Sequence, residues 1–324
     1  MGFKKFALIS VTFLSSVALV ACGSGAAPKD GDSVSVGIIQ YAEHDALSSS
    51  RKGFIEALED AGYVEGKNLI IDYHNAQGDQ ANLQTMIDQL AGSNDVNFAI
   101  ATPAAQALLN VDSETPTIFT AVTDPVSAGL VDSLEKPGGN MTGSIDATDV
   151  EGQINMLLEV VPKAVTVGIF YNSSEVNSEV QATQAKKALE SAGKTVVIKT
   201  VTSTNDVQQV MTSLAGQVDA IYLPTDNTVA STVATIGEIL VEKKVPAIGS
   251  DEAYLEAVLF TYGVDYHAIG IQAGELAVEV LKGKKPADLA VEKPETAAIA
   301  VNEEMAKALG IDPKTIIHLN KSVR

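Results

Sequence analysis

The sequence predicts an α/β protein of two similar lobes, each built on a doubly wound parallel sheet. The stretch VSVGIIQY, which contains Gly37, returns as VTVGIFYN around Gly168, and these two glycines are 131 positions apart. The helical patterns that follow, EALEDAG and KALESAG, place Gly62 and Gly193 at the same spacing. A spacing that holds across two elements and the loop between them indicates an internal repeat. We therefore expect two Rossmann-like lobes with a cleft between them.

The first lobe shows apolar runs of strand length in alternation with stretches whose apolar residues recur at helical spacing. Pro103 suits the first turn of a helix, where its missing N–H is no loss. This alternation predicts a parallel sheet with helices on both faces. The expected strands are 34–40, 69–73, 98–101 and 117–119, and the expected helices are 49–61, 83–90 and 102–109.

The second lobe repeats this order, and the chain is then expected to return. Its expected strands are 165–170, 196–200, 220–223 and 246–248, and its expected helices are 180–192, 207–214 and 229–241. We expect three crossings between the lobes, at the Gly- and Pro-rich segment 136–146, at 259–266 and at 289–300, with a helix at 268–281 on the first lobe. The predicted lobes are 34–143 plus 257–290 and 144–256 plus 291–324. A three-segment hinge allows closure over a ligand while limiting shear.

The N-terminus has the parts of a lipoprotein signal peptide. Residues 1–22 contain two early lysines, an apolar run too short for a comfortable membrane span, and the sequence LVAC ending at Cys22. LVAC resembles the bacterial lipobox, whose cysteine is lipidated, and Cys22 is the single cysteine of the chain. Residues 23–33 have the small and polar composition of a flexible tether. These features predict a protein held by a lipid at Cys22 on the outer side of the bacterial cell membrane.

Charge and motifs exclude several classes of function. The formal charge is −19, from 22 basic and 41 acidic residues. A binder of nucleic acid or of anionic membranes needs the opposite surplus. The four histidines are scattered without metal-ligand spacing, and no GxSxG, HExxH or comparable nucleophile pattern occurs. We expect no metal, no cofactor and no catalysis, so the protein is not predicted to be an enzyme.

Four long motifs carry a family resemblance. They are GFIEALEDAGYVEGKNL, ATPAAQAL, FTAVTDPVSAGLV and KPGGNMTG, and they occur in this order along the chain. Together they resemble the substrate-binding lipoproteins of ABC importers with the type I periplasmic-binding-protein fold. More narrowly, they are similar to the branch that includes tryptophan-binding and aromatic amino acid-binding lipoproteins. Several long motifs in order are far more specific than any one of them.

The resemblance implies a transport function. A monomeric receptor would capture an aromatic amino acid, with tryptophan as the first candidate, and deliver it to a permease with a cytoplasmic ATPase. A ligand-sensing lipoprotein of the same fold is an alternative. A receptor for a peptide, a nucleoside or a branched aliphatic amino acid is another.

Ligands of open parallel sheets bind beyond the carboxyl ends of the strands, where a zwitterion needs donors for its carboxylate. We expect these donors to be the Thr102 hydroxyl and the free amides of Ala104 and Ala105, because a helix N-terminus presents unpaired N–H groups. Thr120 would supply a second hydroxyl. In the resembling amino acid receptors, hydroxyls at these two strand ends serve this role. A purely structural capping role for Thr102 is equally compatible with the sequence.

The ammonium of the ligand needs an acid, and its side chain needs a wall. The resemblance favours Asp251 for the ammonium, with Asp226 and Asn227 as the next candidates. The remaining candidates are the polar and aromatic residues at other strand ends. Tyr41 and Tyr171 could stack on the ligand ring from opposite sides or serve in ordinary packing. Asp124 fits an Asx turn before Pro125 better than a ligand contact. Asn172 and Ser250 complete the set of candidates.

Overall fold

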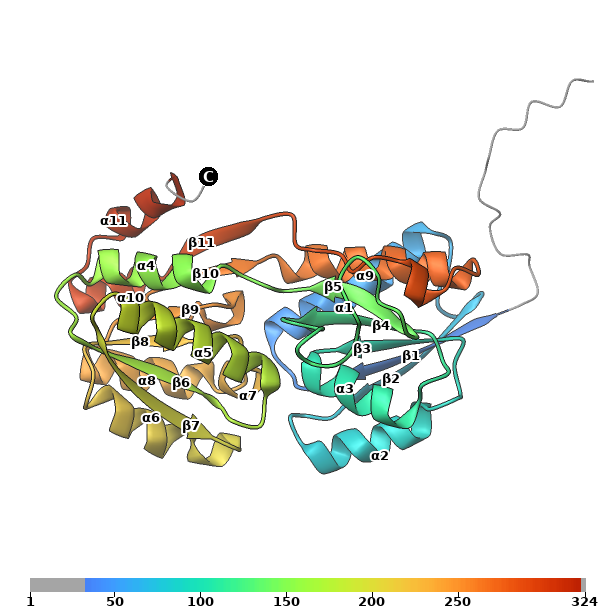
Figure 1. Ribbon diagram of the computed structural model, residues 1–324, viewed down its shortest axis with the longest axis horizontal. Coiled ribbons are helices and arrows are strands. Elements are labelled where there is room, and N and C mark those ends of the chain that lie inside the picture. The colour runs from blue at the N-terminus through green and yellow to red at the C-terminus, as the bar shows by residue number, and fades with distance from the viewer. Residues whose placement is uncertain (1–32, 322–324) are drawn as a thin grey trace, which may run out of the picture.

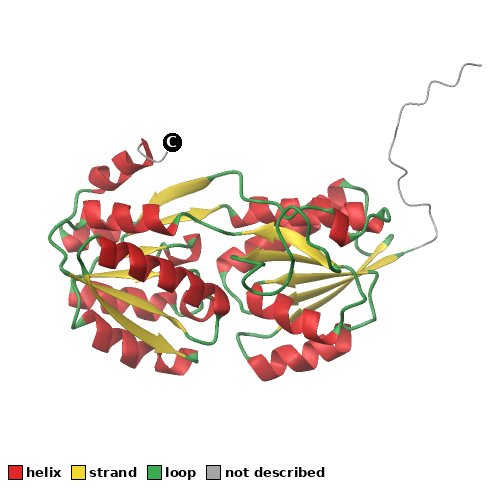
Figure 2. Cartoon of the chain, viewed as in Figure 1, coloured by secondary structure: helices red, strands yellow, loops and turns green. Residues whose placement is uncertain are grey.

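A computed structural model describes residues 33–321, and it shows two α/β lobes side by side (Figure 1). Helices lie on both faces of each sheet (Figure 2). The predicted fold class is thereby confirmed. The predicted signal peptide, Cys22 and nearly all of the tether lie outside the described residues.

Within residues 33–321, the first lobe has a five-stranded parallel sheet in the order β2-β1-β3-β4-β5. Three helices follow the first three strands, and a fourth, α9, is supplied by the distant segment Tyr266–Leu281. The elements are β1 (Val34–Gln40), α1 (Asp45–Asp60), β2 (Leu69–Asn75), α2 (Gln80–Leu90), β3 (Val96–Ile100), α3 (Thr102–Val111), β4 (Thr117–Val122) and β5 (Met141–Ile145).

The second lobe has a six-stranded sheet in the order β11-β10-β9-β8-β6-β7, as far as the described residues show. All of its strand pairs are parallel except β10 with β11. Its strands are β6 (Thr166–Asn172), β7 (Thr195–Val201), β8 (Ala220–Leu223), β9 (Ala247–Gly249), β10 (Phe260–Val264) and β11 (Ala297–Val301). Its helices are α4 (Val150–Val160), α5 (Val176–Ser191), α6 (Val207–Ala215), α7 (Asn227–Ala230), α8 (Val233–Lys243), α10 (Glu303–Leu309) and α11 (Pro313–Ile317), with the short 3₁₀ turns η1 (Thr204–Asp206), η2 (Glu252–Tyr254) and η4 (His318–Lys321).

The internal repeat of the sequence is a repeat of structure. In both sheets the second strand of the lobe lies at the edge, next to the first, which in turn pairs with the third. Gly62 and Gly193 directly follow the turns that end α1 and α5, and both have positive φ, +92° and +72°. That conformation favours glycine, so the same residue recurs where the same turn recurs.

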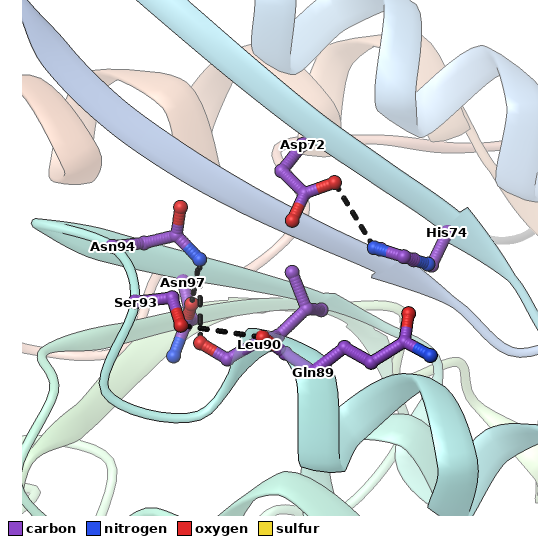
Figure 3. A network of polar contacts seen from close by, with 7 residues as sticks. All are labelled: Asp72, His74, Gln89, Leu90, Ser93, Asn94 and Asn97. Atoms are coloured by element: carbon purple, nitrogen blue, oxygen red, sulfur yellow. Dashed lines mark hydrogen bonds and ion pairs between the residues drawn. The ribbon is translucent and has the colours of Figure 1, made fainter.

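Gly37 on β1 is required by a close approach and not by its backbone conformation. The side chains of Asn94 and Asn97 meet at 3.4 Å, and Asn94 also reaches the carbonyl of Leu90 (Figure 3). A Cβ at Gly37 would lie 2.3 Å from Nδ2 of Asn94, so this pair occupies the space that a side chain would need. Figure 3 also shows the Asp72–His74 contact on β2, at 3.0 Å.

The chain passes between the lobes three times within the described residues. The crossings follow β5, follow β10, and lie between the 3₁₀ turn η3 (Pro286–Asp288) and β11; all three run along one side of the molecule (Figure 1). Before the third crossing, Glu292 pairs with Gly143 and Ile145 of β5. The hinge therefore contains three segments, two of which are tied together by backbone hydrogen bonds.

The predicted lobe ranges need three corrections at the hinge. Residues 144–145 belong to the first lobe, because β5 pairs with β4. Residues 257–264 belong to the second lobe, because β10 pairs with β9 and β11 and its residues up to Tyr262 join the second core, while Val264 at its end joins the first. Residues 291–292 belong to the first lobe, because Val291 packs in the first core and Glu292 bridges β5. The segment MTGSI is small and partly polar, which concealed a buried strand inside a Gly- and Pro-rich stretch.

Helix α9 packs against α1 with very close backbone contact. A Cβ at Gly270 would lie 2.1 Å from the Ser50 carbonyl oxygen, and one at Gly53 would lie 2.2 Å from the His267 carbonyl oxygen. The hydroxyl of Ser50 donates to the Tyr266 carbonyl at 3.0 Å. Glycines at the crossing thus let the returning segment join the first core.

In residues 33–321, no helix combines the length and the apolar character needed to cross a membrane.

Candidate functional site

Polar side chains gather where the carboxyl ends of the strands of both lobes face each other. Such a band of buried polar groups at a sheet edge is the usual place for a ligand in open parallel sheets. Each of these side chains is at most 8% exposed. From the first lobe they are Thr102, Thr123 and Asp146, and from the second lobe they are Asn172, Glu175, Asn177, Asp226, Asn227, Thr228, Ser250 and Asp251.

Five polar atoms in this region are buried without a hydrogen-bond partner among the described residues. Buried polar atoms are nearly always paired in native proteins, so each unpaired atom requires an explanation. Here the five atoms come from loops and helix starts of both lobes. They are Nδ1 of His44, Oγ1 of Thr102, Oγ1 of Thr123, Oδ1 of Asp146 and Oδ1 of Asn177. All five belong to residues that follow the carboxyl ends of strands, which is the usual position of a ligand-binding site in open parallel sheets.

The N-terminus of α3 presents donors to this interface. The Ala105 amide donates to the Ala101 carbonyl at 3.1 Å, so it is used inside the helix. The amides of Thr102 and Ala104 come earlier in the chain than the first N–H with an intrahelical partner, so both are free to donate to a ligand. The unpaired hydroxyl of Thr102 lies beside them. Of the three predicted carboxylate-binding residues, two thus offer free groups and Ala105 does not.

The backbone is strained at two points of the same edge. Ala101 has φ +83° and ψ +153°, and Ala121 at the end of β4 has φ +54°. Both values lie in the region that favours glycine, and each such residue costs about 1–3 kcal/mol. Strain of this kind concentrates at functional sites. The positive φ values of Ala101 and Ala121 set the direction in which the chain leaves β3 and β4.

Two predicted residues on β4 and its loop have internal roles. The Thr120 hydroxyl meets that of Ser144 at 2.8 Å, and Ser144 in turn donates to the Ile269 carbonyl at 2.7 Å. Thr120 therefore joins β4 to β5 and, through it, to α9. Asp124 accepts hydrogen bonds from the Ser127 amide and hydroxyl at 2.9 and 2.6 Å. Both bonds reach three residues on, so they do not form the Asx turn that the sequence favoured, but they give Asp124 the same kind of local role in its own loop.

The two candidate tyrosines do not occupy equivalent positions. Tyr41 is 5% exposed and lines a cavity between the lobes, and burial raises the pKa of its hydroxyl. The 131-residue repeat pairs Tyr41 with Asn172, which lines the same cavity. Tyr171 is one residue earlier on β6, and successive strand residues point to opposite faces. Burial, followed by the charges of Glu179 and Asp226, raises the pKa of its hydroxyl, and Tyr171 is not among the residues that line this cavity.

The start of α7 is bound by two buried acids. Glu175 accepts hydrogen bonds from the amides of both Asn227 and Thr228 at 3.1 Å, and from their side chains at 2.6 and 3.0 Å. Asp226 accepts from the Asn172 and Val229 amides at 2.6 and 2.8 Å. Burial, followed by the charge of Glu175, raises the pKa of Asp226. Glu175 has no distinguishing pattern in the sequence, and our prediction missed it.

Asp251 lies at the end of β9, 2% exposed, and it begins η2. Its Oδ1 accepts from the Ala253 amide at 2.8 Å, and its Oδ2 accepts from the Tyr266 hydroxyl at 2.7 Å. The same hydroxyl lies 2.9 Å from Oδ2 of Asp146. The neighbouring Ser250 hydroxyl contacts Thr225 at 3.0 Å within the second lobe. Asp146 is a second residue that the sequence did not indicate.

The lobes meet around a polar cavity of about 690 Å³. One rim is formed by Tyr41 and the starts of α2 and α3, and the other by Asn172, Thr228 and residues 202–205. The lobes also touch directly, because His44 Nε2 lies 3.3 Å from Oδ1 of Asn227. None of the ion pairs between described residues involves Asp146, Glu175, Asp226 or Asp251. The interface thus carries buried acids without basic partners.

No group of three or more His, Cys, Asp or Glu side chains in the described part of the chain is arranged to hold a metal ion. The described residues combine donors at a helix start of one lobe, buried acids on both lobes and an aromatic ring on the cavity wall, which suits binding of a polar ligand with a ring. Thr102, Asp146 and Asp251 are not among the residues that line the cavity beside Tyr41.

Comparisons with known proteins agree with this geometry. A protein named tyrosine-binding protein from Clostridioides difficile (strain R20291) is 41% identical over 276 residues, which cover 85% of this chain and 80% of that protein. The structure of an ABC domain in complex with L-Trp from Streptococcus pneumoniae is 37% identical, with a TM-score of 0.85 over 89% of this chain and 99% of that chain. A ligand-free, open substrate-binding protein from Clostridium difficile is 41% identical, with a TM-score of 0.66 over 86% of this chain and 95% of that one.

The sequence model of the family described as ABC transporter substrate binding protein matches residues 35–321. This family and this fold are those of transport proteins and not of enzymes, and the resemblance inferred from the four motifs is confirmed. The chain belongs to the ABC transporter substrate-binding proteins.

Proposed function

We propose that this protein binds one aromatic amino acid between its lobes and delivers it to the permease of an ABC importer. The observation that carries the proposal is the set of five unpaired, buried polar atoms at the strand ends of both lobes. The names of the relatives support the ligand class, because one is a tyrosine-binding protein and another was solved with L-Trp. Since substrate-binding proteins of ABC transporters work outside the cytoplasm, the ligand is taken up from there.

The carboxylate of the ligand binds at the start of α3. The Thr102 hydroxyl and the Thr102 and Ala104 amides supply donors, and the positive end of the helix dipole favours an anion there. The unpaired Thr102 hydroxyl supports this role. The strained Ala101 orients the turn that presents these groups.

The ammonium binds on the acidic side of the interface, and Asp251 is the favoured acid. Each of its oxygens accepts one hydrogen bond from the protein and has one further lone pair. Asp226 and Asn227 are weaker candidates, because both are engaged in the Glu175 arrangement at the start of α7. An ammonium removed from water without an acidic partner would be costly, which is why an acid is required.

Tyr41 provides one apolar wall for the ligand ring. Its ring is buried at the lobe interface, and its raised pKa keeps the hydroxyl neutral at physiological pH. An aromatic pair adds roughly 0.5–1.5 kcal/mol beyond the burial of area. A dissociation constant near 1 μM requires about −8 kcal/mol in total, so one stacked ring and a few charge-assisted hydrogen bonds are sufficient. This affinity also permits release.

The lobe arrangement supports a closing receptor. At similar sequence identity, the structure matches the L-Trp complex better than the ligand-free open relative, with TM-scores of 0.85 and 0.66. We further propose that a lipid at Cys22 holds the monomer at the membrane beside its permease. A ligand-sensing role, or a peptide, nucleoside or branched aliphatic ligand, would use the same cleft.

Two measurements test the proposal. Mass spectrometry of ligand released from protein purified without refolding should identify tyrosine or tryptophan. Calorimetry should then give tighter binding of both than of leucine, and Asp251→Ala should weaken binding by at least about tenfold, the loss expected for one charge-assisted hydrogen bond. Equal affinity for leucine would contradict the assignment of an aromatic wall. Unchanged affinity of Asp251→Ala would contradict the assignment of Asp251 to the ammonium.

A further inference from the structure

Two acids from different lobes meet at the hinge through one tyrosine. Asp146 follows the last strand of the first lobe, and Asp251 follows β9 of the second. The Tyr266 hydroxyl, at the start of α9, lies 2.9 Å from the first carboxylate and 2.7 Å from the other. Both carboxylates are 2% exposed. They are therefore within about 6 Å of each other, a range in which like charges disfavour each other.

The two carboxylates of Asp146 and Asp251 need one positive charge or one proton that the surrounding residues do not supply. A hydroxyl has a single hydrogen, so Tyr266 can donate to one of the two carboxylates and not to both. No ion pair between described residues supplies a cation to either acid. Two buried, uncompensated carboxylates would be strongly unfavourable.

Two polar atoms beside the Asp146–Asp251 pair have unused hydrogen-bonding capacity. Oδ1 of Asp146 has no hydrogen-bond partner among residues 33–321. The Thr123 hydroxyl, 8% exposed, is likewise unpaired. The Thr123 hydroxyl lowers the pKa of Asp146 as a hydrogen-bond donor, yet the two groups lack the geometry of a full hydrogen bond, so they are weakly paired neighbours. An ammonium donates three hydrogen bonds, and Asp146, Asp251 and Thr123 together offer three acceptors.

We propose that Asp146 and Asp251 together bind the ammonium of the ligand, so that one cation joins an acid of each lobe and holds the lobes closed. The inference rests on the proposed amino acid ligand and extends it to Asp146, with Tyr266 as the positioning residue. A ligand without an ammonium would leave the two acids facing each other and would not close the lobes.

Below about pH 6, a proton occupies this place when no ligand is bound. Burial raises the pKa of Asp146 to about 6, the charge of Asp251 adds to the rise, and the Tyr266 hydrogen bond opposes it. The other acids around the pair are Glu252, Asp265 and Asp45, and burial, followed by the charge of Asp251, raises the pKa of Glu252 to about 7. The ammonium must displace the proton on Asp146, so binding weakens as the pH falls below 6.

The test compares ligands with and without the ammonium on the protein and on Asp146→Asn. L-tryptophan and indole-3-propanoate differ by this group, as do L-tyrosine and 3-(4-hydroxyphenyl)propanoate. We expect Asp146→Asn to weaken the two amino acids by at least about 30-fold and the two propanoates by less than about threefold, because only the former lose a buried charge pair. The exposed Asp288→Asn, which makes the same change on the first lobe, should alter neither.

Equal effects of Asp146→Asn on both ligand types, or no effect on either, overturn the inference. If the unaltered protein binds neither amino acid, the proposed function itself fails, which is a separate result. A second measurement needs no variant: calorimetry at pH 6 in buffers of different ionisation enthalpy should show release of about half a proton when L-tryptophan binds, because Asp146 is about half protonated there. Absence of proton release also overturns it.

Discussion

The crossing of α1 and α9 is the most sharply defined contact of the first lobe, and Gly270→Ala tests it. The added Cβ would lie 2.1 Å from the Ser50 carbonyl oxygen, whereas Cβ contacts below 3.0 Å essentially do not occur. The helices must therefore separate by about 1 Å, and both backbones resist because their interior is closely packed. Overpacking of this kind costs about 1–3 kcal/mol, and we expect the upper value because the obstacle is backbone.

A loss of about 3 kcal/mol lowers the melting temperature by roughly 5 °C in a protein of this size. Circular dichroism on the ligand-free protein measures it. Gly139→Ala is the matched control, because its Cβ would meet nothing within 4 Å and its φ is not positive. We expect the control to melt within about 1 °C of the parent, since surface changes rarely exceed 0.5 kcal/mol. A melting temperature of Gly270→Ala that equals the control refutes the close approach.

Three further predictions concern the site. Ala101→Gly should leave the free energy of unfolding unchanged or raise it by up to about 1 kcal/mol in urea titration, because relief of a positive φ offsets the lost methyl; a loss above 1 kcal/mol contradicts the strain. Thr102→Val should weaken ligand binding about five- to tenfold in calorimetry without lowering ligand-free stability, because it removes an unpaired buried hydroxyl. The ligand-free protein should melt at a lower temperature at pH 8 than at pH 5. The pKa values of Asp146, about 6, and Glu252, about 7, lie above their ordinary values, so the folded state holds protons that the unfolded state has released, and this stability is lost as the pH rises through them. A constant or rising melting temperature contradicts this sign.

The two-lobed fold could be predicted because its strongest signals are local and are stated twice. Strand β1 and its helix recur with one spacing, and Gly62 and Gly193 keep the positive φ that ends each helix. Three strands of the hinge region, β5, β10 and β11, were not predicted. Strand β5 is short, contains glycine and serine, and owes its position to pairing with β4, while β10 lies between two sheet neighbours that come from distant segments. Pairing between such strands leaves no signal in the hydrophobic periodicity of the sequence.

The candidate site was predicted as a set of loops at strand ends, and its assignment to single residues stays a prediction. Topology alone brings the carboxyl ends of parallel strands together, so loops at the ends of β1, β3, β6 and β9 could be named from the sequence. Side-chain direction depends on a register of single residues: Tyr171 and Asn172 were both predicted as site residues, and of these two Asn172 lines the cavity and Tyr171 does not. The hydroxyl of Thr120 was likewise assigned to the cleft, whereas it bonds to Ser144.

Glu175 and Asp146 show why acids of the interface were missed. In the sequence each is one of 41 acidic residues, most of which are solvated, and neither stands in a pattern. Only the folded chain shows that Glu175 is 1% exposed beneath the start of α7 and that Asp146 faces Asp251 across the hinge. An acid buried at a helix start is compensated by amide donors, whereas an acid buried against another acid is not. The burial of Asp146 therefore needs a proton or a cation as compensation, and the ammonium of an amino acid ligand would supply the cation that we propose.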